Sequence, residues 1–227
     1  MYGCYQSLDL VAVRASILDT DGGRIQPNPN GSAYNLRPIS LGRSPIVSTG
    51  ETFEQKAGDG TICVTLTDPD VTTGETLTLN LCQLDLELIS VMTGAAVLLD
   101  GGGGEVYGLE APDPSIAQSP IEFHAWTKAY AGSSPVGGTP YWHWVWPYTQ
   151  WNIGDWTFER GIMSVSLTGK AAANDNLGAG SFCDLPGAGV QQFFGVWLAD
   201  DVPDADVAPY NVGGISCGFV ETPDCTS

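Results

Sequence analysis

The fold expected of this chain is decided by two stretches, Thr61-Ile62-Cys63-Val64-Thr65-Leu66-Thr67 and Glu75-Thr76-Leu77-Thr78-Leu79-Asn80-Leu81-Cys82. In both stretches apolar and polar residues alternate strictly, which is typical of a half-buried β-strand. The residues between them, 68–74, include Pro69 and Gly74. Proline fixes φ and glycine permits positive φ, so this segment has the composition of a turn. We therefore predict a β-hairpin over residues 61–82.

The alternation also predicts the register of this hairpin. If Val64 faces Leu81, the apolar residues of both strands share one face, whereas a slip of one residue would place apolar opposite polar. The same register brings Cys63 opposite Cys82. This pair is expected to stay reduced in a protein made in the cytosol, and it is placed to form a disulfide in oxidising surroundings.

A short helix is predicted directly after the hairpin. Asp85 is suited to be its N-cap, and Gly94 suits the left-handed conformation that ends a helix. The residues expected on its buried side are Leu86, Leu88, Ile89 and Met92. Hairpin and helix together form a scaffold without chemistry of its own.

The balance of charge is the most unusual bulk property of the chain. Its 227 residues include 8 Lys or Arg and 26 Asp or Glu, a net charge of −18. Residues 57–127 contain 11 acidic residues and residues 171–227 contain 8, and neither range contains Lys or Arg. Such a surface repels phosphates, which argues against a protein that reads nucleic acid. It indicates either a solubility device or a surface past which a polyanion moves without sticking.

The rest of the chain predicts one domain over residues 1–227, rich in strands. Its 29 Gly and 15 Pro favour turns over long helices. Residues 27–50 carry four prolines and are expected to form a long loop, and residues 171–227 an extended acidic C-terminal part. The predicted fold is mainly β, an antiparallel sandwich or rolled sheet with one short flanking α-helix. No apolar run is long enough to cross a membrane, and the amino end lacks a leader pattern.

We find no catalytic or cofactor motif in the sequence. The six cysteines lack metal-ligand spacing, and His124 and His143 lack a third ligand, so we expect no metal, no cofactor and no enzyme. The aromatic run Tyr141–Trp146 leaves one alternative open, a secreted carbohydrate-binding β-sandwich. Alternating tryptophans are more often packed in a core or an interface.

Several segments taken in order resemble the major tail tube proteins of long-tailed phages that infect actinobacteria. They are Val13–Asp19, Gly60–Cys63 with Asp68–Asp70, Leu79–Cys82 with Met92–Gly94, Ala125–Ala129, Pro140–Pro147, Trp151–Asp155 with Glu159–Gly161, and Cys217–Val220. The resemblance lies in the order and spacing of these segments over residues 10–220. The chain departs from the family in its tryptophans after Tyr141 and in its acidity.

The resemblance implies a structural virion protein of the phage tail that assembles in the host cytoplasm. Its subunits would form hexameric rings whose sheets join into an inner β-barrel, and the rings would stack into a tube. The partners implied are other copies of the chain, a tape-measure protein, a tail terminator, and double-stranded DNA that passes through without specific binding. A capsid decoration subunit remains a further alternative.

Two sets of residues follow as candidates for this function. A loop with apolar residues of its own is typically ordered by a partner, so the residues expected to contact the neighbouring ring are Ile39, Leu41, Ile46, Val47 and Phe53. The residues expected to line the lumen are Asp68, Asp70 and Glu75. Acids there would keep a DNA duplex centred by repulsion over a Debye length, about 8 Å at physiological salt.

Overall fold

A computed structural model of the chain describes residues 5–18, 32–35, 38–82, 84–99, 106–113, 118–131, 134–135, 141–159, 162–174 and 194–199. The fold is mainly β, with antiparallel sheets and one short helix, as predicted. The elements are β1 (Tyr5–Ile17), β2 (Ser32–Asn35), β3 (Pro38–Ser48), β4 (Thr52–Lys56), β5 (Ile62–Thr67), β6 (Val71–Leu81), α1 (Leu86–Thr93), β7 (Ala96–Leu99), β8 (Val106–Glu110), β9 (Ile121–Ala131), β10 (Ser134–Pro135), β11 (Tyr141–Glu159), β12 (Ile162–Ala171) and β13 (Gly195–Ala199).

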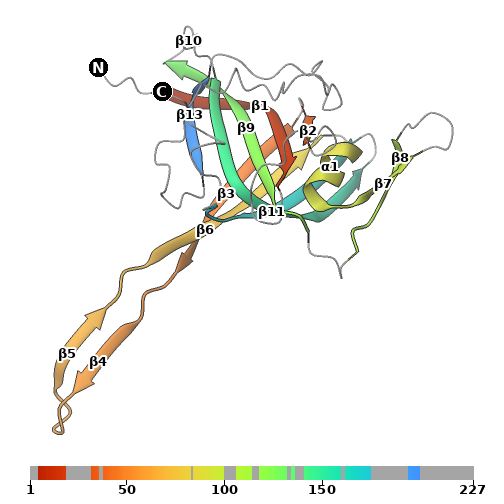
Figure 1. The fold of residues 1–227 in the computed structure, drawn as a ribbon. Helices are drawn as coiled ribbons and strands as arrows, with labels where there is room; N and C mark the ends of the chain where they lie inside the picture. Colours follow the sequence, from red (N-terminus) through yellow and green to blue (C-terminus); the bar gives the residue numbers. More distant parts are fainter. Residues whose placement is uncertain are drawn as a thin grey trace, which may run out of the picture.

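A nine-stranded sheet forms the body of the molecule, in the order β2-β1-β9-β11-β12-β6-β3, with β10 on β9 and β13 on β11. Helix α1 packs against β1 and β11 on one side of it (Figure 1). The buried cluster between them contains the apolar residues of β6, such as Leu77 and Leu79, together with Leu88 and Met92 of the helix. Alternation along each strand therefore sends one set of side chains into the core and the other to the opposite face.

The helix confirms its predicted capping. The Asp85 carboxylate accepts a hydrogen bond from the amide of Leu88 at 3.0 Å. Gly94 ends the helix in the left-handed conformation, with φ 70°, and its amide donates to the carbonyl of Ser90. Local sequence alone determines both ends, because each cap uses side-chain or backbone groups within four residues.

The predicted hairpin over residues 61–82 is wrong in its pairing. Strand β5 pairs with β4 in a separate two-stranded sheet, and β6 pairs with β3 on one side and β12 on the other. Residues 68–70 do not form the predicted turn; the amide of Asp68 is instead hydrogen-bonded to the carbonyl of Glu51. The chain turns at residues 57–61, where Gly60 has φ 86° and its amide donates to the carbonyl of Ala57 at 2.9 Å. The predicted pair of Cys63 and Cys82 is wrong for the same reason. Cys63 lies in β5, whereas Cys82 directly follows the end of β6 that is farthest from β5.

The predicted loop over residues 27–50 is also wrong where it can be seen. Residues 38–48 form strand β3, which pairs with β6 from Pro38 opposite Leu81 to Ser48 opposite Val71. Strand β3 is the last strand in the order of the sheet, and a proline is tolerated there because the missing N–H faces no partner strand. Residues 27–31 and 36–37 lie outside the described residues. So does the acidic C-terminal part, apart from residues 171–174 and 194–199.

Candidate functional site

The feature that stands out is a two-stranded arm that projects from the body of the molecule (Figure 1). We call residues 49–70 the arm; it contains β4, the turn at residues 57–61, and β5. The pairing runs from Thr52 opposite Thr67 to Lys56 opposite Ile62, with an irregularity after Gln55. Every residue of both strands is exposed, so the core formed by the described residues does not support the arm.

The arm has one apolar face and one polar face. Phe53 faces Leu66 across the strands, and Val64 lies two residues from Leu66 on the same side; we call these three residues the apolar face of the arm. They are 61%, 60% and 51% exposed in the order Phe53, Leu66, Val64. On the other side the hydroxyl oxygens of Thr52 and Thr67 lie 3.3 Å apart. An isolated two-stranded ribbon is marginally stable in water, and exposed apolar patches mark interaction sites.

At the junction between the arm and the body, the segment that enters the arm and the segment that leaves it lie very close together. The amide of Asp68 donates to the carbonyl of Glu51 at 3.0 Å, and the amide of Gly50 donates to the carboxylate of Asp70 at 2.9 Å. A Cβ at position 50 would lie 1.8 Å from the carbonyl oxygen of Asp68, so only glycine fits there. The segment predicted as a turn is thus a hydrogen-bonded continuation of the two strands.

A buried ion pair anchors the root of the arm in the core. Glu75 of β6 is 3% exposed, and its carboxylate accepts a hydrogen bond from the indole N–H of Trp146 at 3.0 Å. The other carboxylate oxygen pairs with the guanidinium of Arg43 on β3. That guanidinium also lies over the ring of Phe194, 4.1 Å from its centroid. Arg43 therefore ties the edge strand to the centre of the sheet.

The face of the sheet opposite the core is polar. We call it the polar sheet face; its residues on β3, β6, β12 and β11 are Ser40, Ser44, Thr76, Thr78, Asn80, Ser166, Thr168, Lys170, Gln150 and Asn152, as the registers align them. Lys170 is the one base among these ten residues. Of the acids on these four strands, Glu75 is buried on the core face, whereas the exposed Asp155 lies in the bulge of β11 opposite Ser166 and so borders the polar sheet face.

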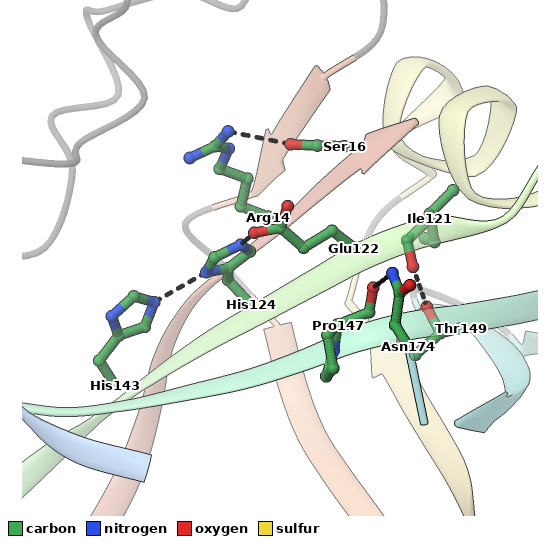
Figure 2. A network of polar contacts seen from close by, with 9 residues as sticks. All are labelled: Arg14, Ser16, Ile121, Glu122, His124, His143, Pro147, Thr149 and Asn174. Atoms are coloured by element: carbon green, nitrogen blue, oxygen red, sulfur yellow. Dashed lines mark hydrogen bonds and ion pairs between the residues drawn. The ribbon is translucent and has the colours of Figure 1, made fainter. Parts of the chain in front are cut away.

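A buried polar network joins β9 and β11, and the Arg14–Ser16 hydrogen bond of β1 lies beside it (Figure 2). His124 bridges the Glu122 carboxylate and His143, whose Nε2 lies 2.8 Å from Nδ1 of His124. His143 also stacks on Trp126, with ring centroids 4.5 Å apart. Burial, together with electrostatic repulsion from the neighbouring His124, lowers the pKa of His143 to about 2, so the His143 ring is neutral. The network satisfies buried polar groups and presents no nucleophile within the described residues.

The structure separates the residues predicted to contact a neighbouring ring. Ile39, Val47 and Phe53 are about half exposed or more, at 53%, 49% and 61%. Leu41 and Ile46 are partly buried, and Leu41 packs against the core. Of the acids predicted for the lumen, Asp68 and Asp70 are exposed at the junction of the arm. Glu75 has to be removed from that set, because it is buried beneath Arg43 on the core face.

Among the described residues no group of His, Cys, Asp or Glu side chains is placed to hold a metal ion. In that same part of the chain no helix is long and apolar enough to cross a membrane. No family model matches the sequence, and no curated protein matches it. The candidate site therefore consists of two surfaces, the arm and the polar sheet face.

Sequence reasoning missed Arg43 and its pairing with Glu75. The two residues are 32 positions apart and meet only because β3 pairs with β6. A lone arginine between two prolines in a predicted loop gives no local signal of an ion pair. The alternation of Ser40, Gly42 and Ser44 with Ile39, Leu41 and Arg43 is the signal that could have identified a strand where a loop was predicted.

Proposed function

We propose that this chain is a structural subunit that assembles with copies of itself into stacked rings, which form the tail tube of a long-tailed phage. The observation that carries the proposal is the arm. A hairpin that projects from its own domain with an apolar face more than half exposed is a surface made for a partner. A contact between this face and a different patch on the next copy does not close on itself, so it propagates as a filament.

The polar sheet face gives the proposal its second support. DNA that travels through a tube must not be held by its phosphates, and every basic contact adds affinity through counterion release. A lining of serine, threonine and asparagine, with Lys170 as the one base among the ten residues of this face, offers few such contacts. We place this face toward the lumen, with acids such as Asp68 and Asp70 near the joints between rings. The tape-measure protein would occupy the same channel before the DNA.

The carbohydrate-binding alternative has weaker support than the tube. A sugar-binding platform needs exposed aromatic rings, whereas in the run Tyr141–Trp146 the ring of Trp146 is buried and Tyr141, Trp142 and Trp144 are only partly exposed. Phe123 packs between Trp146 and Trp151, with centroid distances of 5.8 Å and 4.8 Å. These tryptophans fill the body of the sheet.

Electron microscopy of the purified protein tests the proposal. The wild-type chain is expected to form rings and filaments that are long relative to their width. The variant to compare replaces residues 52–67 by an Asn-Gly turn, which suits a two-residue hairpin between strands already hydrogen-bonded at Glu51 and Asp68. It is expected to stay folded, by circular dichroism, and to form no filaments.

A matched control keeps the arm and changes only its polar face, with Thr65→Ser and Thr67→Ser. It is expected to assemble like the wild type, because the polar face is not the surface that is covered. A wild-type protein that remains a monomer at every concentration, or that is retained on polysaccharide resin, would refute the tube. Particles that bind phage heads without forming tubes would favour the decoration subunit instead.

A further inference from the structure

A second exposed apolar hairpin lies on the side of the molecule opposite the arm (Figure 1). Strands β7 and β8 form their own two-stranded sheet, with Leu99 opposite Val106 and Leu98 opposite Gly108. Leu98, Leu99 and Tyr107 are 36%, 53% and 67% exposed. We call these three residues the hairpin patch. It lies beside helix α1, which the β7–β8 hairpin contacts.

Large exposed apolar side chains are concentrated in two places within the described residues. Of those that are exposed, all but Ile39 and Val196 belong either to the arm and its root or to the hairpin patch; Ile39 lies at the end of β3 that is farthest from the arm. The two groups lie at opposite sides of the molecule, separated by the main sheet. A subunit with two different apolar patches facing away from each other has the geometry of a head-to-tail contact, in which one patch covers the other on the next copy.

Resting on the proposed function, we propose that the apolar face of the arm docks on the hairpin patch of a copy in the neighbouring ring. Phe53, Val64 and Leu66 leave on the order of 300 Å² of apolar surface exposed, and the hairpin patch leaves about as much. The two areas therefore match. A second copy is the occupant because each patch finds in the same chain a surface of its own size and chemistry.

The small area of the contact indicates that a single arm binds weakly and that several arms act together. Together the two patches bury roughly 600 Å², which is below the ~1,200 Å² that a stable pair of proteins needs. One arm on one hairpin is therefore a weak contact. Copies already joined in a ring present several such contacts at once, and the second and later ones form at a high effective concentration. Stacking then follows ring formation instead of preceding it.

The arm and the β7–β8 hairpin both carry net negative charge, which opposes the contact and predicts how stacking depends on salt. The arm carries five acids and one base, Lys56, while residues 96–110 carry three acids and no base. Added salt screens like charges, so salt is expected to strengthen stacking. An interface held by ion pairs would respond in the opposite direction.

The test uses the full-length chain with two variants, an arm variant with Phe53→Ser and Leu66→Ser and a hairpin variant with Leu99→Ser and Tyr107→Ser. Each is expected to raise the concentration at which filaments appear in sedimentation by about tenfold or more, since central apolar residues dominate contact energies. Val196→Ser is the matched control, because Val196 is exposed like Leu98 but lies outside both patches. Circular dichroism checks that every variant is folded.

Mixing the two variants separates this docking from a general loss of assembly. The hairpin variant still has an intact arm and the arm variant an intact hairpin patch, so the mixture is expected to form paired rings that grow no further. If the hairpin variant alone forms filaments like the wild type, the docking is overturned while the tube stands. If the wild type forms no filaments, the proposed function fails and the docking with it.

Discussion

The buried ion pair at the root of the arm supports a prediction whose size can be worked out from the structure. Replacing Arg43 by Met leaves the Glu75 carboxylate, 3% exposed, with a hydrogen bond from the indole N–H of Trp146 and without its ion pair. Removing one member of a fully buried pair typically costs about 3–5 kcal/mol. The Arg43 side chain is 38% exposed, so water screens part of the interaction and the expected cost is about 2 kcal/mol.

A double-mutant cycle isolates the ion pair from the other contacts of Arg43. The guanidinium also lies over Phe194, and this cation–π contact is lost both in Arg43→Met and in Arg43→Met combined with Glu75→Gln. It therefore cancels from the coupling energy. Because Gln retains an oxygen for the Trp146 N–H, the coupling is expected to be about 1–2 kcal/mol.

Urea unfolding of the dilute subunit, followed by tryptophan fluorescence, provides the free energies of unfolding for the four proteins of the cycle. The m-value should be unchanged, which shows that the same surface is exposed in each. A coupling below about 0.5 kcal/mol would refute the reasoning, because it is the size found for exposed surface pairs. In that case Glu75 would be held by Trp146 and the sheet alone.

Three further predictions concern single positions. Gly50→Ala places a methyl group 1.8 Å from the carbonyl oxygen of Asp68, so the junction should open and the Asp68 amide, which donates to Glu51, should exchange its hydrogen faster than in wild type; unchanged protection there would contradict the close approach. Asp85→Ala removes the N-cap of α1 and should lower the free energy of unfolding by about 1 kcal/mol, with Asp85→Asn as the control that retains a capping oxygen. The pKa of His143 is lowered to about 2 in the folded chain, so on acidification the unfolded chain binds a proton at this residue before the folded chain does. The free energy of unfolding should therefore decrease as the pH is lowered below the ordinary pKa of 6.5, by at most about 1.4 kcal/mol per pH unit. A His143→Gln variant should lose this part of the pH dependence between pH 5 and 6.5. If the free energies of unfolding of the variant and the wild type change in parallel over this range, the ring of His143 is not neutral.

The sequence by itself determined the elements whose causes are local. Helix α1 begins after Asp85 and ends at Gly94 as predicted, because each cap acts within a few residues. Alternation identified β5 and β6 as strands, because the period of a strand can be recognised from neighbouring residues alone.

Only the tertiary structure decided which strands pair. Alternation marks a face without naming its partner, so the pattern that matched Val64 to Leu81 was equally satisfied by matching Leu41 to Leu79 and Phe53 to Leu66. That choice moved Val64 from an expected core to an exposed arm, and it moved Glu75 from an expected lumen to the core. Partners 32 residues apart, such as Arg43 and Glu75, meet through the register of the sheet, and the cost of closing so long a loop is recovered only when the whole sheet forms.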